Sequence, residues 1–124
     1  MLRMPEGSET HPTRKTPPMG KLLYGTHQRE LEIDDRTLAH LKVVVITKLR
    51  RGETFGLSWE KDKQQGSGRS TIWLSPHIPL EFDFYGGRPP GLNRAWLSML
   101  SESADRGELV LVAEPSESAQ RPAG

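Results

Sequence analysis

The chain has 124 residues, which is enough for one small domain with a single core. It contains no cysteine, which excludes disulfides, thiolate nucleophiles and cysteine-ligated metal centres. The formal net charge is +1, and basic and acidic residues balance once the two polar arms are set aside, so the domain lacks the strong positive field typical of nucleic-acid-binding proteins.

Residues 1–18 hold four prolines and almost no apolar side chains after Met4, which predicts a disordered arm. Met19 opens a strand-like sequence and is a candidate for the true start of the protein. Residues 115–124, rich in Ser, Glu, Pro and Ala, predict a second disordered arm, which leaves 19–114 as the folded domain. No apolar run approaches the roughly 20 residues that cross a bilayer, and no secretory signal is evident, so we expect a cytoplasmic protein.

The first predicted element is a β-hairpin, because residues 21–25 and 30–34 alternate apolar and polar side chains around a polar connection. The next stretch, DDRTLAHLKVVVITKLRRGE at 34–53, is consistent with a helix or, over its VVVIT centre, with a strand. At helical spacing its apolar residues form one stripe, made of Leu38, Leu41, Val45 and Leu49. His40 and Thr47 are then expected on the opposite face. Asp34 or Asp35 can cap the first turn, and a helix dipole favours the bases near the end, so we predict a helix that Gly52 ends.

Three half-buried strands are predicted next, since apolar residues alternate in 54–59, 70–75 and 80–85. A loop at 86–91 leads to a second helix, which Asn93 caps and Gly107 ends, with its core face formed by Trp96, Leu97, Met99 and Leu100. Residues 109–113 are apolar on both faces, which predicts a strand inside the sheet. The order ββαβββαβ indicates an α+β domain with two helices on one face of a mainly antiparallel sheet.

Two groups of basic residues are candidate contacts for nucleic acid or another anion. The first is Lys48, Arg50 and Arg51, although the preference of cations for a helix C-terminus is the simpler explanation of this group. The second is Arg69, Arg88 and Arg94, which meet only if the loop before Arg69 folds toward the start of the second helix. That loop, QQGSGRS at 64–70, lacks the Gly-Lys-Ser/Thr of a phosphate-binding loop, so we predict a hairpin connection there.

The outward side chains of the predicted sheet form the other candidate site, an interaction face made of Trp73, Tyr85, Glu81 and Asp83. Exposed aromatic residues on a sheet can stack bases, but such platforms are basic and this one is acidic. An aromatic pair beside acids fits a protein partner or a second copy of the chain better. The alternative is that the arms or neighbouring side chains cover the tryptophan.

Nothing in the sequence specifies a catalytic residue, a cofactor or a metal ion. Glu81 with Asp83, and Glu30 with Glu32 and Asp34, have the spacing of a metal or acid–base pair, but any solvated strand face shows the same spacing. The four histidines, His11, His27, His40 and His77, lack metal-ligand spacing, and His77 is expected in a turn between Pro76 and Pro79. Ser58 in GLSWE lacks the second glycine of a nucleophile elbow.

The stretches MGKLLYG, DDRTLAHLKVVVITKLRRGE, GSGRSTIWLSPHIPL and LNRAWLSML together resemble a family of small actinobacterial proteins without an assigned function, over Met19 to about Glu114. Members of that family often carry the label ATP-dependent DNA ligase. Such ligases form a lysine–AMP intermediate at a Lys-x-Asp-Gly motif, and no lysine of this chain has aspartate two residues on, Lys61-Asp62-Lys63 being the nearest approach. The resemblance therefore brings no catalytic residue to this chain.

The sequence predicts a small cytoplasmic interaction or binding module without evident catalytic chemistry, which binds a protein partner or a second copy of itself. The alternative is a DNA-associated accessory protein that acts weakly through the basic groups, and a ligase-type enzyme is the third possibility. No cofactor and no membrane contact are expected.

Overall fold

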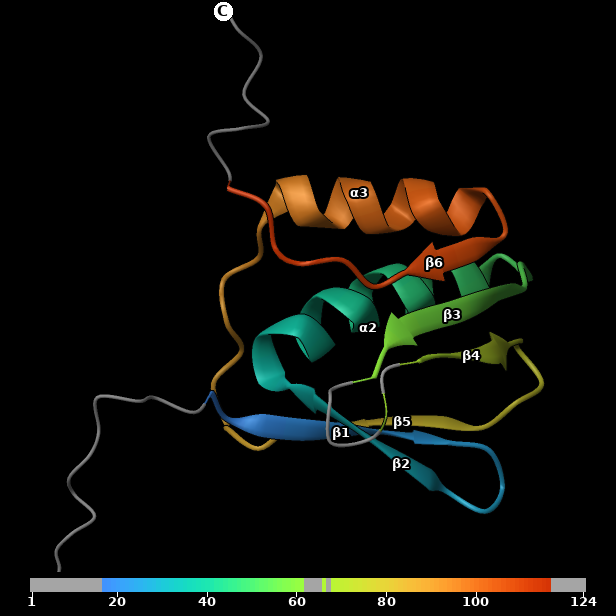
Figure 1. Ribbon diagram of the computed structural model, residues 1–124, viewed down its shortest axis with the longest axis horizontal. Coiled ribbons are helices and arrows are strands. Elements are labelled where there is room, and N and C mark those ends of the chain that lie inside the picture. The colour runs from blue at the N-terminus through green and yellow to red at the C-terminus, as the bar shows by residue number, and fades with distance from the viewer. Residues whose placement is uncertain (1–16, 62–65, 67, 117–124) are drawn as a thin grey trace, which may run out of the picture.

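The computed structural model describes residues 17–61, 66 and 68–116, which form two helices and six strands in the predicted order (Figure 1). The α+β class is therefore confirmed. The predicted arms at 1–18 and 115–124 lie outside the described residues except for 17–18 and 115–116. Within the 64–70 connection, where a hairpin was predicted, residues 64, 65 and 67 also lie outside the described residues.

The strands form two three-stranded sheets, where the sequence predicted one. In the first sheet, β1 (Met19–Tyr24) lies between β2 (Arg29–Asp34) and β5 (Leu80–Asp83), and both pairings are antiparallel. In the second, β3 (Phe55–Glu60) lies between β4 (Arg69–Leu74), which is antiparallel to it, and β6 (Glu108–Val110), which is parallel to it.

A proline turn explains why β5 leaves the sheet of its predecessor. Pro76 and Pro79 supply no backbone N–H to a ladder, so the connection after β4 cannot continue as a tight hairpin. Its Ile78 N–H instead donates to the Ser75 carbonyl, as expected of a turn around His77, and Gly25 N–H at the end of β1 donates to the Pro79 carbonyl. The next strand, β5, therefore pairs with β1 of the first sheet.

The last strand is an edge strand, so the prediction that it is internal was wrong. Glu108–Val110 pairs only with β3, and Val110 is exposed while Leu109 is buried. A helix side chain satisfies the free edge: Ser103 Oγ donates to the Glu108 carbonyl at 2.8 Å and accepts from Val110 N–H at 2.8 Å. Covering the edge in this way protects it from pairing with another chain.

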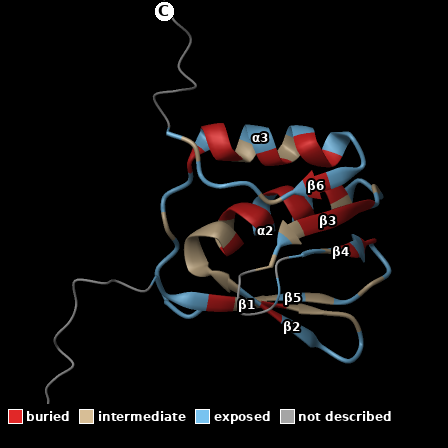
Figure 2. Cartoon of the chain, viewed as in Figure 1, coloured by how far each residue is buried: buried red, intermediate tan, exposed pale blue. Residues whose placement is uncertain are grey.

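Helix α2 (Asp35–Arg50) packs against β1 and β2 on one side and against α3 (Arg94–Asp105) on another, while α3 covers β3 and β6. Figure 2 shows β3 and the facing sides of both helices as buried. The core joins both sheets through side chains that include Leu22, Leu38, Leu57 and Leu100. Met99 was expected there but is 38% exposed.

Candidate functional site

Four polar side chains form a closed network where α2 begins, α3 begins and the C-terminal segment passes. Arg36 donates from Nε and Nη2 to the two carboxylate oxygens of Glu114, both at 2.8 Å. Asn93 Nδ2 donates to Glu114 at 2.8 Å, and Asn93 N–H donates to His40 Nε2 at 2.8 Å. His40 Nδ1 closes the circuit on the Arg36 carbonyl at 2.7 Å. The network fixes the two helix starts and residue 114 relative to one another.

His40 is fully buried in this network, so the prediction that it faces away from the core was wrong. Helix α2 is enclosed on two sides, by the first sheet and by α3, and its buried arc is wider than the leucine stripe alone. The His40 ring packs on Trp96 with centroids 4.6 Å apart. Because a carbonyl only accepts, Nδ1 carries the proton and Nε2 accepts from Asn93, which assigns the neutral tautomer.

The first turn of α2 also holds both ends of the loop at 85–91. Asp35 accepts from Tyr85 N–H at 3.0 Å and from Gly86 N–H at 2.8 Å. Arg36 Nη1 donates to the Gly91 carbonyl at 2.9 Å. Two successive helix residues of opposite charge therefore fix the loop where it starts and where it ends.

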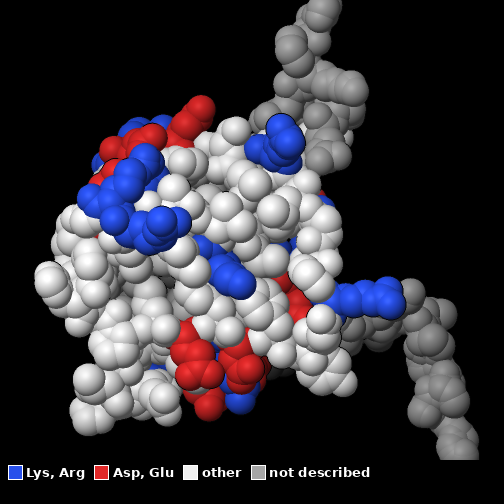
Figure 3. Space-filling view, turned by 180° about the vertical axis from the view of Figure 1, so that it is seen from behind, with Lys and Arg blue, Asp and Glu red and all other residues white. Residues whose placement is uncertain are grey.

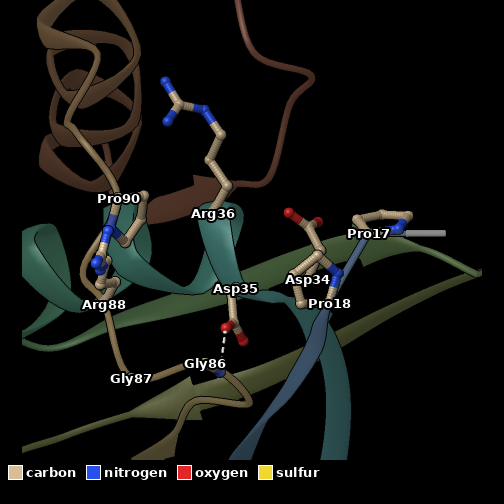
Figure 4. A pocket seen from close by; sticks show the side chains of 9 residues that line it. All are labelled: Pro17, Pro18, Asp34, Asp35, Arg36, Gly86, Gly87, Arg88 and Pro90. Carbon is tan, nitrogen blue, oxygen red and sulfur yellow. Dashed lines mark hydrogen bonds between the residues drawn. The ribbon is translucent and has the colours of Figure 1, made fainter. Parts of the chain in front are cut away.

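A hollow of about 520 Å³ lies between this loop and the start of α2 (Figure 4). Its walls are the loop residues 86–88, the helix cap Asp34, the first two helix residues 35–36 and three prolines, Pro17, Pro18 and Pro90. In Figure 4 the Asp35 carboxylate points to Gly86, whereas Arg88 and Asp34 stand on opposite sides of the hollow. In Figure 4, Arg88 and Pro90 lie on one side of the hollow and Asp34, Pro17 and Pro18 on the other, so a charged group and an apolar ring occur on both sides.

Arg88 is exposed and keeps its charge available. Within residues 17–61, 66 and 68–116, no group donates to, accepts from or pairs with its guanidinium. The two aspartates that share the hollow are turned to donors of their own, Asp35 to the loop backbone and Asp34 to Thr37 N–H and Thr37 Oγ1. A ligand anion would therefore meet an unpaired cation here.

The first predicted basic group is mostly neutralised within the fold. Lys48 is buried and pairs with Asp105 and, at 3.7 Å, with Glu53. Arg51 pairs with Glu53 at 3.5 Å, which leaves Arg50 as the exposed member without an ion pair in the described part of the chain. Figure 3 shows basic and acidic side chains intermixed at the edge of the molecule where both helices end.

The second predicted basic group is dispersed. Arg69 starts β4, Arg88 lies in the loop and Arg94 starts α3. In the described part of the chain no hydrogen bond or ion pair joins any two of them. The N–H groups at the start of α3 that were expected to receive an anion are already engaged, because Asn93 Oδ1 accepts from Ala95 N–H and Trp96 N–H.

Trp73 and Tyr85 do not share a sheet face as predicted, because Trp73 lies in the second sheet and Tyr85 in the loop that follows the first. Trp73 lies on β4 of the second sheet and is 54% exposed. Tyr85, which is 78% exposed, follows β5 and starts the loop 85–91. Tyr24 Oη donates to the Trp73 carbonyl at 2.7 Å, and Tyr24 is opposite Leu80, so β5 separates the two aromatic residues along its whole length.

The acids of that row lie on the outer face of the first sheet. Lys21 is opposite both Glu32 and Asp83, and Leu23 is opposite both Glu30 and Glu81, so these side chains share one face. Lys21 pairs with Glu30 at 3.3 Å. Figure 3 shows acidic side chains gathered at the lower edge of the molecule. In the described part of the chain no three acidic or histidine side chains are placed to hold a metal ion.

A model of one protein family matches residues 19–114, which is most of the chain. The chain belongs to that family, described as Domain of unknown function (DUF7882). Comparisons of the chain with curated proteins and with solved structures gave no match. No helix in the described residues of this DUF7882 domain is long and apolar enough to cross a membrane.

The sequence analysis of the DUF7882 domain missed the residues that organise the site. Arg36 and Glu114 were not singled out, and Asn93 was identified as a helix cap only. Their partners lie far away in the sequence, so no local spacing reports them. A usable signal was present at 34–36, because a cap needs only one of two successive aspartates and the second was left without a role.

Two carboxylates of the domain titrate below their ordinary range. Hydrogen bonds from Arg36 and then Asn93 lower the pKa of Glu114 from 4.5 to about 2. The hydrogen bond from Lys48 lowers the pKa of Asp105. Both groups are therefore charged at neutral pH, and the Glu114 carboxylate keeps the network intact.

Proposed function

We propose that this DUF7882 domain is a cytoplasmic binding module that holds a protein partner at the loop 85–91. The observation that carries the proposal is the contrast within that loop. Asp35 and Arg36 fix its two ends, whereas Tyr85 and Arg88 project from it, exposed and with side chains unpaired in the described part of the chain.

A fixed backbone favours binding, because little backbone entropy remains to be lost when a partner docks, and the unpaired side chains are available for contacts. Tyrosine and arginine are also the residue types that dominate the energetics of protein interfaces. The exposed Leu92 follows the loop and adds apolar surface beside it. The loop, the two side chains and the hollow together form one contact surface.

The distribution of charge favours a protein partner over the nucleic-acid alternative. Four acids with a single lysine occupy the outer face of the first sheet, and Lys48 and Arg51 are paired with acids. A duplex would meet few unpaired cations and a repulsive sheet face.

The proposal is tested by affinity capture from native lysate with cross-linking, using the wild type, Tyr85→Ala/Arg88→Ala and Trp73→Ala. The Tyr85 N–H bond to Asp35 is a backbone bond, so the double variant keeps the loop in place. We expect the wild type and the Trp73 variant to capture the same protein and the double variant to lose it. Equal capture by all three, or loss only with Trp73→Ala, contradicts the proposal.

Light scattering after size exclusion distinguishes a foreign partner from a second copy. If the partner is another copy, the wild type elutes as a dimer and Tyr85→Ala/Arg88→Ala as a monomer. Binding of DNA at about 20 mM salt that the double variant retains would instead support the nucleic-acid alternative.

A further inference from the structure

We propose that the hollow between the loop 85–91 and the start of α2 receives the carboxyl-terminal residues of the partner protein. In this arrangement Arg88 binds the terminal α-carboxylate, Asp34 accepts from a peptide N–H, and the last side chain packs on the prolines. The inference rests on the proposed function, since it names the part of the partner that the loop recognises.

The charge of the hollow selects a single carboxylate. Arg88 is its unpaired cation, because Arg36 is occupied by Glu114 and by the Gly91 carbonyl. Asp34 and Asp35 line the same space, and a phosphate with nearly two negative charges would be repelled by both. A carboxylate carries one charge and fits the planar fork of an arginine with two hydrogen bonds.

The opposite wall provides the second contact. Asp34 accepts one hydrogen bond on each oxygen, from Thr37 N–H and Thr37 Oγ1, and each oxygen can accept another. Figure 4 places its carboxylate across the hollow from Arg88. A ligand that bridges the two walls therefore carries an anionic group at one end and an N–H donor nearby, as the end of a peptide chain does.

The size and the apolar walls favour a short peptide over a free ion. A volume of about 520 Å³ lies within the range of about 300–1,000 Å³ that is usual for ligand sites and far exceeds what one carboxylate fills. Pro17, Pro18 and Pro90 offer rigid apolar rings to a side chain without a cost in side-chain entropy. The loop ends are fixed, so the site is formed before the ligand arrives.

The test is titration of the ¹⁵N-labelled full chain with a pool of N-acetylated tetrapeptides of varied last residue, prepared as free acids and as C-terminal amides. At about 1 mM peptide we expect the amide signals of Gly86 and Gly87 to shift with the acids and not with the amides. Arg88→Gln should abolish the shift. Arg94→Gln is the matched control, because it removes an exposed arginine at the start of the other helix, outside the hollow, and should leave the shift unchanged.

Three outcomes overturn the inference: no shift with either pool, equal shifts with acids and amides, or shifts that Arg88→Gln leaves intact. N-acetylated single amino acids form a separate arm, and saturation by these alone would assign the hollow to a free small molecule and contradict a peptide terminus. If the peptide titration fails but affinity capture still depends on Tyr85 and Arg88, the carboxyl terminus is rejected as the ligand and the proposed function stands. If affinity capture does not depend on these two residues, the proposed function itself is rejected.

Discussion

Both helices begin with a side-chain cap, but the cap of α3 is buried and the cap of α2 is partly open to solvent. Asp34 caps α2 by accepting from Thr37 N–H, and Asn93 caps α3 by accepting from Ala95 N–H and Trp96 N–H. Asn93 is 2% exposed and uses its N–H and its amide group on three further partners, His40, Glu114 and Pro115. Asp34 is only half-buried and borders the hollow.

The difference teaches that a capped helix start becomes a site only where the surrounding chain leaves it open. At α3 the His40 ring and the C-terminal segment bury the cap residue Asn93. At α2 the charges of the first turn reach outward to hold a loop, and the loop stands away from the helix. Each prediction below changes one side of this contrast.

The largest expected effect is that of Asn93→Ala on stability. The change removes a cap of two N–H groups and two hydrogen bonds from the side-chain amide, so we expect unfolding to become easier by about 2–3 kcal/mol. Urea unfolding followed by circular dichroism measures it. Asn93→Asp keeps the cap but sets a second carboxylate beside Glu114, and should fall between the wild type and Asn93→Ala. An Asn93→Ala variant as stable as the wild type would contradict the role of Asn93.

Elements governed by short-range chemistry were predictable from the sequence. The hairpin, both helices, both caps and the glycines that end the helices follow from local patterns, and Gly52 and Gly107 indeed adopt positive φ of 80° and 99°. Gly20 shows what local patterns omit. A Cβ there would lie 2.6 Å from the Asp83 carbonyl and 2.8 Å from Asp35 Oδ1, and both belong to segments distant in sequence.

Features that depend on pairing between distant segments were not predictable. The apolar run at 109–113 is compatible both with an internal strand and with an edge strand that Ser103 protects. A basic residue near the end of a helix is explained by the helix dipole. The neighbouring sequence does not indicate that Lys48 is buried and paired with Asp105 of α3. His40 was placed by counting from one apolar stripe, whereas two neighbouring layers enclose α2. The site inherits this uncertainty because its network joins residues 36, 40, 93 and 114.

The second effect is a loss of stability in acid that depends on Glu114. Its pKa is about 2 in the folded chain against 4.5 for the ordinary group, so folding favours the carboxylate. The stability gained is complete above about pH 4.5 and is lost as pH falls toward 2. Because the group is partly exposed, we expect about 1–2 kcal/mol.

Glu114→Gln is the control for this prediction. Urea unfolding at neutral pH should show the variant to be less stable than the wild type, and the two should converge near pH 2. The Asp105–Lys48 pair also weakens as pH falls, but it does so equally in the wild type and the variant. The difference in unfolding free energy between the two proteins therefore reports on Glu114. A difference that stays constant from neutral pH to pH 2 would contradict the role of the carboxylate charge.

The third effect is that of Asp34→Ala at the open helix start. Here one cap and one hydroxyl contact are lost, and no buried network depends on them, so we expect a loss of about 1 kcal/mol. The measurement is the same urea unfolding, and Asp34→Asn, which can also cap, should restore most of the stability. If Asp34→Ala cost as much as Asn93→Ala, the two helix starts would be equally closed and the contrast between them would fail.

The smallest effect on stability is expected for Arg88→Gln, within about 0.5 kcal/mol of the wild type. The side chain is exposed and has no partner among residues 17–61, 66 and 68–116, so its removal breaks no contact of the fold described there. Glutamine keeps polarity and most of the length but removes the charge. If the melting temperature of Arg88→Gln is instead clearly lower than that of the wild type, Arg88 stabilises the folded chain and is not free to bind a ligand. An unchanged melting temperature with lost partner capture is the result that separates a binding residue from a structural one, because the contacts that hold the loop at Asp35 and Arg36 are left in place.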